Sequence, residues 1–120
     1  MFATLNIYIM TYSRKEDFDA NSQELAKFFR VLSHPARVAI LKYLAEQKQC
    51  FSGDITDEIP LSRTTVSQHL QELKNSGLIQ GTITGTRVNY CLCGNNISKA
   101  AKIIEEFLKF INIGKIECDC

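Results

Sequence analysis

Three of the five cysteines in the chain could form a ligand set for a soft metal ion. Cys118 and Cys120 stand one residue apart at the end of the chain, and Cys50 supplies a third thiol. Thiolate sulfur selects soft ions over hard ones. Three such sulfurs suit trivalent arsenic or antimony, copper(I) or cadmium. We therefore predict a metal or metalloid site made of these three cysteines, with Cys50 coming from the same chain or from a partner chain.

The same thiols also fit two different interpretations. Cys118 and Cys120, or Cys50, could form disulfides or persulfides and report redox state, as exposed thiols of low pKa can. The tail could also be disordered, with incidental cysteines. Cys91 and Cys93 lie at i and i+2 on one face of a predicted strand, with no third ligand nearby in the sequence. An odd number of cysteines without secretory context predicts reduced thiols and a cytoplasmic protein.

A second set of residues has the chemistry for reading DNA. It lies on the segment that begins at Ser62, where apolar residues recur at helical spacing and the opposite side is polar. Short hydroxyl side chains allow a close approach, a helix N-terminus can meet a phosphate, and Gln68 can pair with adenine through two hydrogen bonds. Basic side chains can add phosphate contacts. The predicted DNA-binding residues are Ser62, Arg63, Thr64, Thr65, Ser67, Gln68, Gln71, Lys74, Thr86 and Arg87.

Composition limits the classes to which the chain can belong. Its 120 residues are about the length of one domain. With 45% hydrophobic and 22% charged residues it matches an ordinary soluble protein, and no run is long and apolar enough to span a membrane. The net charge of +1 means that nucleic-acid binding depends on a local patch. No nucleophile with its base, and no carboxylate pair, occurs at a plausible spacing, so we do not expect an enzyme.

The elements before Ser62 are predicted to be helices. Apolar spacing predicts a first helix over 22–32, which Ser33-His34-Pro35 interrupts before a second helix. The residues expected to point inward from the second helix are Val38, Leu41, Leu44 and Ala45. Residues 54–59 are predicted to form a short helix closed by Pro60.

Three residues near these helices have expected roles that are structural. We expect His34 to be a helix-junction residue and His69 to be a hydrogen-bonded structural histidine. Arg37 is expected to contact either a phosphate or the protein itself.

The polar segment and the residues after it predict a capped helix and a hairpin. Ser62 is a good N-cap, and Gly77 stands where a helix end favours a left-handed residue. Residues 78–84 and 87–92 alternate or are β-branched, and Gly85-Thr86 between them predicts a turn with Arg87 beside it. The residues expected to point inward are Val88, Tyr90 and Leu92, which leaves Arg87, Asn89, Cys91 and Cys93 outward.

The last predicted helix, over 97–111, carries more apolar surface than one small core needs. Its two adjoining stripes are Ile97, Ala101, Ile104, Leu108 and Ile111, and Ala100, Ile103, Phe107 and Phe110. Surplus apolar surface is where a partner chain docks, so we expect a homodimer.

These elements together predict a winged helix-turn-helix, mainly α-helical with a small β-hairpin. In such a unit the second helix presents side chains to bases in the major groove. The predicted organisation is an N-terminal extension over 1–20, a winged helix-turn-helix DNA-binding domain over 21–112 and a cysteine-containing tail over 113–120. The alternative is a winged-helix module that mediates protein contacts only.

Four stretches, in this order, closely resemble the arsenic-repressor/SmtB (ArsR-type) family of bacterial winged-helix regulators. They are LSHPAR (32–37), LSRTTVSQHLQEL (61–73), SGLI (76–79) and GTRVNY (85–90). The resemblance covers about residues 25–111. It implies a homodimeric repressor that binds double-stranded operator DNA and releases it when an effector binds. It also implies that the first and last helices pair the subunits.

The metal sites of that family are incomplete in this chain. The resemblance implies a pair of cysteines one residue apart at the start of the first helix of the helix-turn-helix, but Cys50-Phe51-Ser52 keeps only one. Where carboxylate and imidazole ligands are expected on the last helix, the chain has Asn96, Ser98, Lys99 and Lys102. We therefore predict no cofactor needed for folding, and an effector such as As(III), Sb(III) or another soft ion bound at the cysteines.

Overall fold

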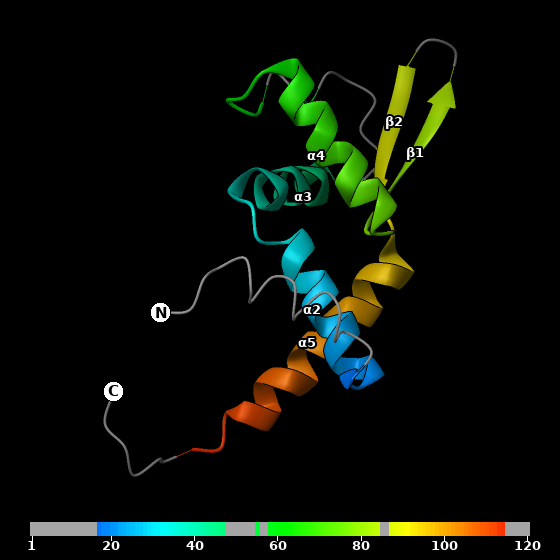
Figure 1. The fold of residues 1–120 in the computed structure, drawn as a ribbon. Helices are drawn as coiled ribbons and strands as arrows, with labels where there is room; N and C mark the ends of the chain where they lie inside the picture. Colours follow the sequence, from blue (N-terminus) through cyan, green and yellow to red (C-terminus); the bar gives the residue numbers. More distant parts are fainter. Residues whose placement is uncertain (1–16, 48–54, 56–57, 85–86, 115–120) are drawn as a thin grey trace.

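The protein is mainly helical, with one antiparallel hairpin. The computed structural model describes residues 17–47, 55, 58–84 and 87–114. Its elements in chain order are α2 (Ala20–Val31), α3 (Pro35–Gln47), α4 (Arg63–Asn75), β1 (Ile79–Thr84), β2 (Arg87–Leu92) and α5 (Gly94–Ile111) (Figure 1). Within these ranges, none of the helices combines the length and apolar character needed to cross a membrane. Of the short helix predicted over 54–59, residues 55, 58 and 59 are described, and there the Glu58 N–H donates to the Ile55 carbonyl. The other three residues lie outside the described ranges.

The break between α2 and α3 lies where the sequence predicts it. Leu25, Phe28 and Val31 form the buried face of α2. The helix ends as the Leu32 N–H donates to the Phe28 carbonyl and the Ser33 hydroxyl donates to the Arg30 carbonyl. Pro35 then begins α3, where its missing N–H costs little.

The buried face of α3 differs from the predicted one. Ala36, Ile40 and Leu44 are buried, whereas Val38 is 39% exposed and Ala45 is also exposed. The prediction is right for Leu44 and wrong for Val38 and Ala45. Apolar residues surround most of the circumference of α3, so spacing alone does not identify the side that meets the core.

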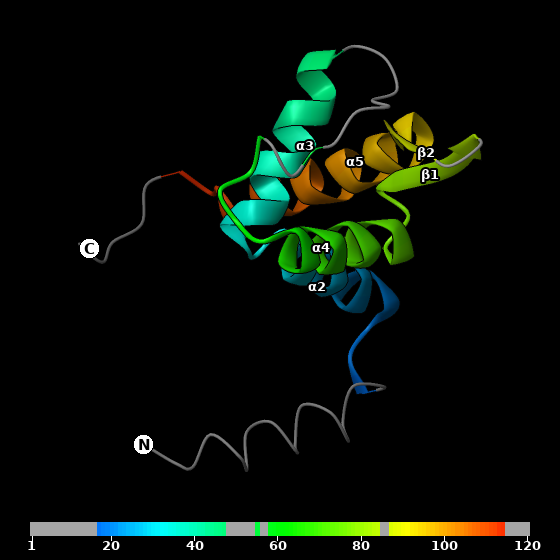
Figure 2. The same cartoon turned by 90° about the horizontal axis from the view of Figure 1, so that it is seen from above.

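The core lies where α3, α4 and the base of the hairpin meet. Ile40, Val66 and Leu73 are fully buried there, and Leu78 and Ile79 are nearly so. The hairpin register pairs Ile79 with Leu92 and Thr84 with Arg87. Both views place the hairpin beside the C-terminal end of α4 (Figures 1 and 2).

Helices α2 and α5 cross each other on the opposite side of α3 from α4 (Figure 1). The rings of Phe29 and Phe107 meet edge to face between them, with centroids 6.1 Å apart. Helix α5 begins at Gly94, three residues before the predicted start, because the Cys93 carbonyl already accepts the Ile97 N–H. Of its residues only Ala100 is buried, and much of its apolar surface is exposed.

Candidate nucleic-acid interface

Helix α4 begins with a side-chain cap that uses two of the predicted DNA-binding residues. The Ser62 Oγ accepts a hydrogen bond from the Thr65 N–H at 3.2 Å, and it donates one to the Thr65 Oγ1 at 2.9 Å. The predicted N-cap is therefore confirmed. The two hydroxyls satisfy each other at the helix start, and their shown role is to stabilise the first turn of α4.

The outward side of α4 is polar and exposed. Val66, Leu70 and Leu73 face the core. The residues exposed on the other side are Arg63, Thr64, Ser67, Gln68, Gln71 and Lys74. The Gln71 Nε2 donates to the Asn75 Oδ1 at 2.9 Å, which holds that amide along the helix. Gln68 is exposed and lies in the N-terminal half of α4. This is the half that the second helix of a helix-turn-helix presents to base edges.

The hairpin stands next to this helix as a wing would. Thr84 pairs with Arg87 at the end of the ladder, and Thr86 lies outside the described residues. The backbone of Arg87 therefore lies at the end of the hairpin ladder, next to the predicted turn.

The two faces of the hairpin differ less in solvent exposure than the alternating sequence predicts. Tyr90 and Leu92 pack against the core as expected. Asn89 and Cys91, predicted to point outward, are half-buried as well. Cys93 is not a strand residue, because it occupies the N-cap position of α5.

Two histidines and an arginine link the helices beneath the polar face. The Arg37 Nε donates to the His69 Nδ1 at 3.2 Å, and the His34 Nδ1 accepts the Ala36 N–H at 3.0 Å. The two imidazole rings lie 4.3 Å apart between centroids. The structural roles expected of both histidines are confirmed, and of the two expectations for Arg37 the structure shows the intramolecular contact.

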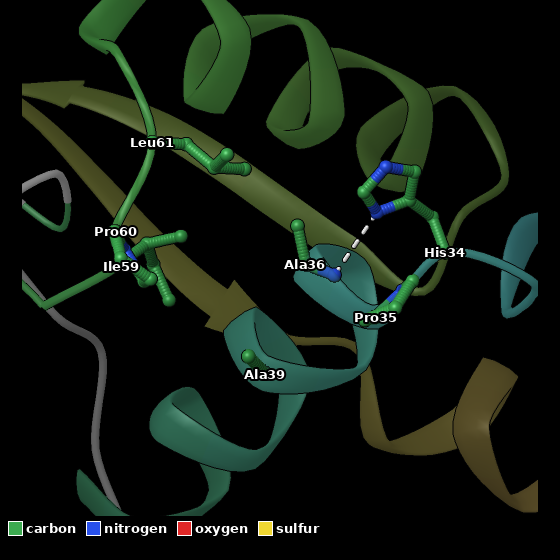
Figure 3. A pocket seen from close by; sticks show the side chains of 7 residues that line it. All are labelled: His34, Pro35, Ala36, Ala39, Ile59, Pro60 and Leu61. Carbon is green, nitrogen blue, oxygen red and sulfur yellow. Dashed lines mark hydrogen bonds between the residues drawn. The ribbon is translucent and has the colours of Figure 1, made fainter.

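A small apolar cavity lies at the start of α3 (Figure 3). It has a volume of about 280 Å³, and its lining residues are His34, Pro35, Ala36, Ala39, Ile59, Pro60 and Leu61. At the edge of the cavity, the His34 ring turns its Nδ1 toward the Ala36 N–H (Figure 3). The lining has no nucleophile and no carboxylate, so the cavity has none of the groups of a hydrolytic site.

The predicted metal ligands Cys50, Cys118 and Cys120 lie outside the described residues. In the part of the chain that is described, no three His, Cys, Asp or Glu side chains are grouped to hold a metal ion. Cys93 is a free thiol, whereas Cys91 is disulfide-bonded. Of the two cysteines among the described residues, the expectation of a reduced thiol holds for Cys93 and not for Cys91.

The zinc-type ligand positions of α5 hold other chemistry. The Asn96 Nδ2 donates to the Gly77 carbonyl oxygen at 2.8 Å. Ser98, Lys99 and Lys102 are exposed, and ammonium groups do not ligate metal ions. The contact of Asn96 with the end of α4 has no local signal in the sequence, because the two residues are 19 positions apart.

Comparison with known proteins identifies regulators of transcription. Residues 34–80 match the model of the family described as bacterial regulatory protein, arsR family. An uncharacterized HTH-type transcriptional regulator of Methanocaldococcus jannaschii is 30% identical over 84 residues, which cover 70% of this chain and 94% of that protein.

Solved structures show the same fold. An ArsR-like transcriptional regulator from Rhodococcus sp. RHA1 has a TM-score of 0.64 and 26% identity, covering 78% of this chain and 88% of that one. The second structure is a homodimeric winged helix-turn-helix DNA-binding domain from Mycobacterium bovis, a possible ArsR-family transcriptional regulator. It has a TM-score of 0.58 and 21% identity, covering 86% of this chain and 96% of that one. The fold is therefore a winged helix-turn-helix, as predicted.

Proposed function

Because the chain belongs to the arsR family of bacterial regulatory proteins, we propose that it is a homodimeric repressor of transcription that a soft metal ion or metalloid releases from its operator. Membership makes the chain a DNA-binding transcriptional regulator and not an enzyme. The direction of regulation, the effector and the residues that carry them are the proposal. Its place of action is the cytoplasm, with the DNA.

The observation that carries the proposal is the exposed polar side of α4. Thr64, Ser67 and Gln68 stand on it, opposite the buried Val66 and Leu70. Hydroxyl and amide side chains at the start of a helix match the hydrogen-bonding groups of base edges in the major groove. Two further features support contacts to the DNA backbone: the basic Lys74 in the last turn of α4, and the hairpin that stands beside this helix.

The experiment that tests DNA binding is selection from a randomised pool of duplexes. The purified reduced protein should enrich a roughly palindromic site, because a two-fold dimer reads two half-sites. Affinity for the enriched duplex should fall steeply with salt, as phosphate contacts require. Failure to enrich any duplex, together with stable binding to another protein, would favour the interaction module instead.

Exposed apolar residues on α2 and α5 support the homodimer. Leu108 is 51%, Phe110 79% and Ile111 51% exposed in the single chain, and Phe29 on α2 is 40% exposed. Leaving this surface in water costs roughly 25 cal/mol for each Å² that a partner could cover. A second copy, which offers the same surface, is the occupant that a two-fold interface requires.

Thiolate chemistry supports a soft effector over a hard one. In the reduced protein the three candidate ligands Cys50, Cys118 and Cys120 all supply thiolate sulfur, which binds arsenic(III), antimony(III), copper(I) or cadmium. Asn96, Lys99 and Lys102 on α5 do not offer the carboxylate and imidazole set of a zinc site. Binding at the tail would draw it toward the helix-turn-helix and change the spacing of the two reading helices.

A thiol-redox repressor is the second candidate, and the disulfide at Cys91 favours it. Cys91 lies on β2, within the wing. Oxidation state could therefore alter the hairpin that flanks α4. Under this alternative, DNA affinity should differ between reduced and oxidised protein without metal, and Cys91→Ser should abolish that difference. The metal proposal expects no such difference.

A further inference from the structure

Arg37 connects three helices through one side chain. It lies on α3, where its Nε donates to the His69 Nδ1 of α4 at 3.2 Å. Its Nη1 donates to the carbonyl oxygen of Val31, the last residue of α2, at 3.3 Å. Carbonyls in the last turn of a helix lack an intrahelical partner, and a cation is favoured there. Arg37 thus connects the end of α2, a helix expected at the dimer contact, to α4, the helix that carries Gln68.

His69 must be neutral at Nδ1 for this connection to exist. A nitrogen that accepts the Arg37 N–H carries no proton, so the proton of the neutral ring is on Nε2. His69 is only 8% exposed, and among the described residues it is the only polar side chain that is buried. A proton on Nδ1 would replace an acceptor by a donor that faces another donor.

The charges around His69 oppose protonation. Burial lowers the pKa of His69, and His34, at the junction of α2 and α3, and Arg37, on α3, lower it further. Glu72, on α4 itself, raises the pKa and offsets part of this effect. The folded state therefore keeps His69 neutral below the value of 6.5 at which an ordinary histidine takes up a proton. Stability from this group is full above pH 6.5 and is lost as the pH falls from there through the lower folded-state pKa.

We propose that Arg37 and His69 are positioning residues for α4, and that DNA affinity falls when a proton displaces Arg37 from the His69 Nδ1. The inference rests on the proposed reading of DNA by α4. His69 is the next residue to Gln68, so the Arg37 hydrogen bond fixes the part of α4 that carries the reading side chains. Hydrogen bonds to base edges tolerate little displacement, so a shift of α4 costs affinity. The sign is opposite to that of general electrostatics, because protonation adds positive charge and would otherwise strengthen DNA binding.

The first test compares affinities for the selected duplex at about pH 7.5 and about pH 5.5. The wild type should lose affinity as the pH falls through the lowered folded-state pKa of His69, and by a larger factor than His69→Gln. His69→Gln, which keeps an acceptor but cannot take up a proton, should bind within about twofold at both values. His34→Gln is the matched control and should retain the fall. If the wild type and His69→Gln change by the same factor, the proposal is wrong.

A second measurement needs no DNA and no variant. Long-range proton–nitrogen NMR of the wild-type histidines should show His69 with an unprotonated Nδ1 at about pH 7.5, and with a midpoint below that of a free histidine. A protonated Nδ1 at this pH would overturn the proposal even if His69→Gln failed to fold. The failure of the proposed function is a different result, namely that no duplex is enriched at about pH 7.5.

Arg37→Lys separates positioning from a phosphate contact. Lysine keeps the charge but lacks the planar fork that reaches two acceptors. A positioning role predicts that Arg37→Lys and Arg37→Gln both lose about two- to tenfold in affinity, with the wild-type salt slope. If Arg37→Lys restores affinity and Arg37→Gln lowers the slope by about one, Arg37 contacts a phosphate and the inference fails.

Discussion

Asn96, in the first turn of α5, donates a hydrogen bond from its Nδ2 to the carbonyl oxygen of Gly77, at 2.8 Å. Gly77 lies just after α4 and has a φ of 85°, a conformation that favours glycine. A Cβ on Gly77 would lie 3.0 Å from the same Nδ2. The end of α4 is therefore fixed both by backbone conformation and by a contact with α5.

Substitutions at this contact should lower stability. Gly77→Ala is expected to cost roughly 1–2 kcal/mol, because alanine is disfavoured at positive φ and its Cβ would crowd Asn96. Asn96→Ala should cost about 1 kcal/mol through the lost hydrogen bond. The neighbouring Asn95, which is exposed, provides the control Asn95→Ala. Urea unfolding measures all three, and equal free energies of unfolding for Asn95→Ala and Asn96→Ala would show that the hydrogen bond adds no stability.

The cap of α4 gives a second stability prediction. Ser62→Ala removes the acceptor of the Thr65 N–H and should cost about 1 kcal/mol. Ser67→Ala, on the exposed side of the same helix, should change stability little. Thermal unfolding of the two variants distinguishes them. A Ser62→Ala variant as stable as the wild type would mean that the helix start is held by other contacts.

Two variants on α4 should alter DNA binding in different ways. Gln68→Ala removes the amide that we propose reads a base, and it should change the selected sequence, with a loss of about 1–3 kcal/mol at the affected base pair. Lys74→Ala should weaken binding to all sequences and lower the salt slope by about one. Lys102→Ala on α5 removes the same type of charge away from α4. Selection and salt titration with each variant provide the measurement, and identical preferences for Gln68→Ala and wild type would argue against this helix as the reader.

The exposed end of α5 should set the oligomeric state. Phe110 is 79% exposed in the single chain, and Phe110→Glu would place a charge in the proposed interface. We expect sedimentation to show a dimer for the wild type and a shift toward monomer for this variant. Leu61→Glu, at a residue 40% exposed before α4, is the control and should remain dimeric. If the wild type is a monomer at micromolar concentration, the proposed homodimer is wrong, and with it the reason to expect DNA sites made of two half-sites.

The sequence predicts those parts of the fold that depend on local signals. Ser62 and Gly77 mark the two ends of α4 through capping and through positive φ, and both appear where expected. The alternation of β1 and β2 predicts their pairing. The inward face of α3 is not predictable from spacing, because Val38 and Ala36 are both apolar and only the packing of α4 chooses between them.

The candidate site is predictable in its residue types but not in its contacts. Spacing places Gln68 on an exposed helix side, yet it does not reveal that Ser62 and Thr65 bond to each other. The Arg37–His69 contact joins residues 32 positions apart, which a helical pattern does not report.

Arsenite titration of the reduced protein bound to its selected duplex is the decisive measurement for a repressor released through its cysteines. Fluorescence anisotropy of the duplex measures the release. We expect the DNA to be released at about one arsenite for each three-thiolate site. The double variant Cys118→Ser with Cys120→Ser should bind the duplex normally and stay bound. If arsenite releases the variant as readily as the wild type, the tail is not the effector site; if arsenite releases neither, the protein does not respond to this metalloid.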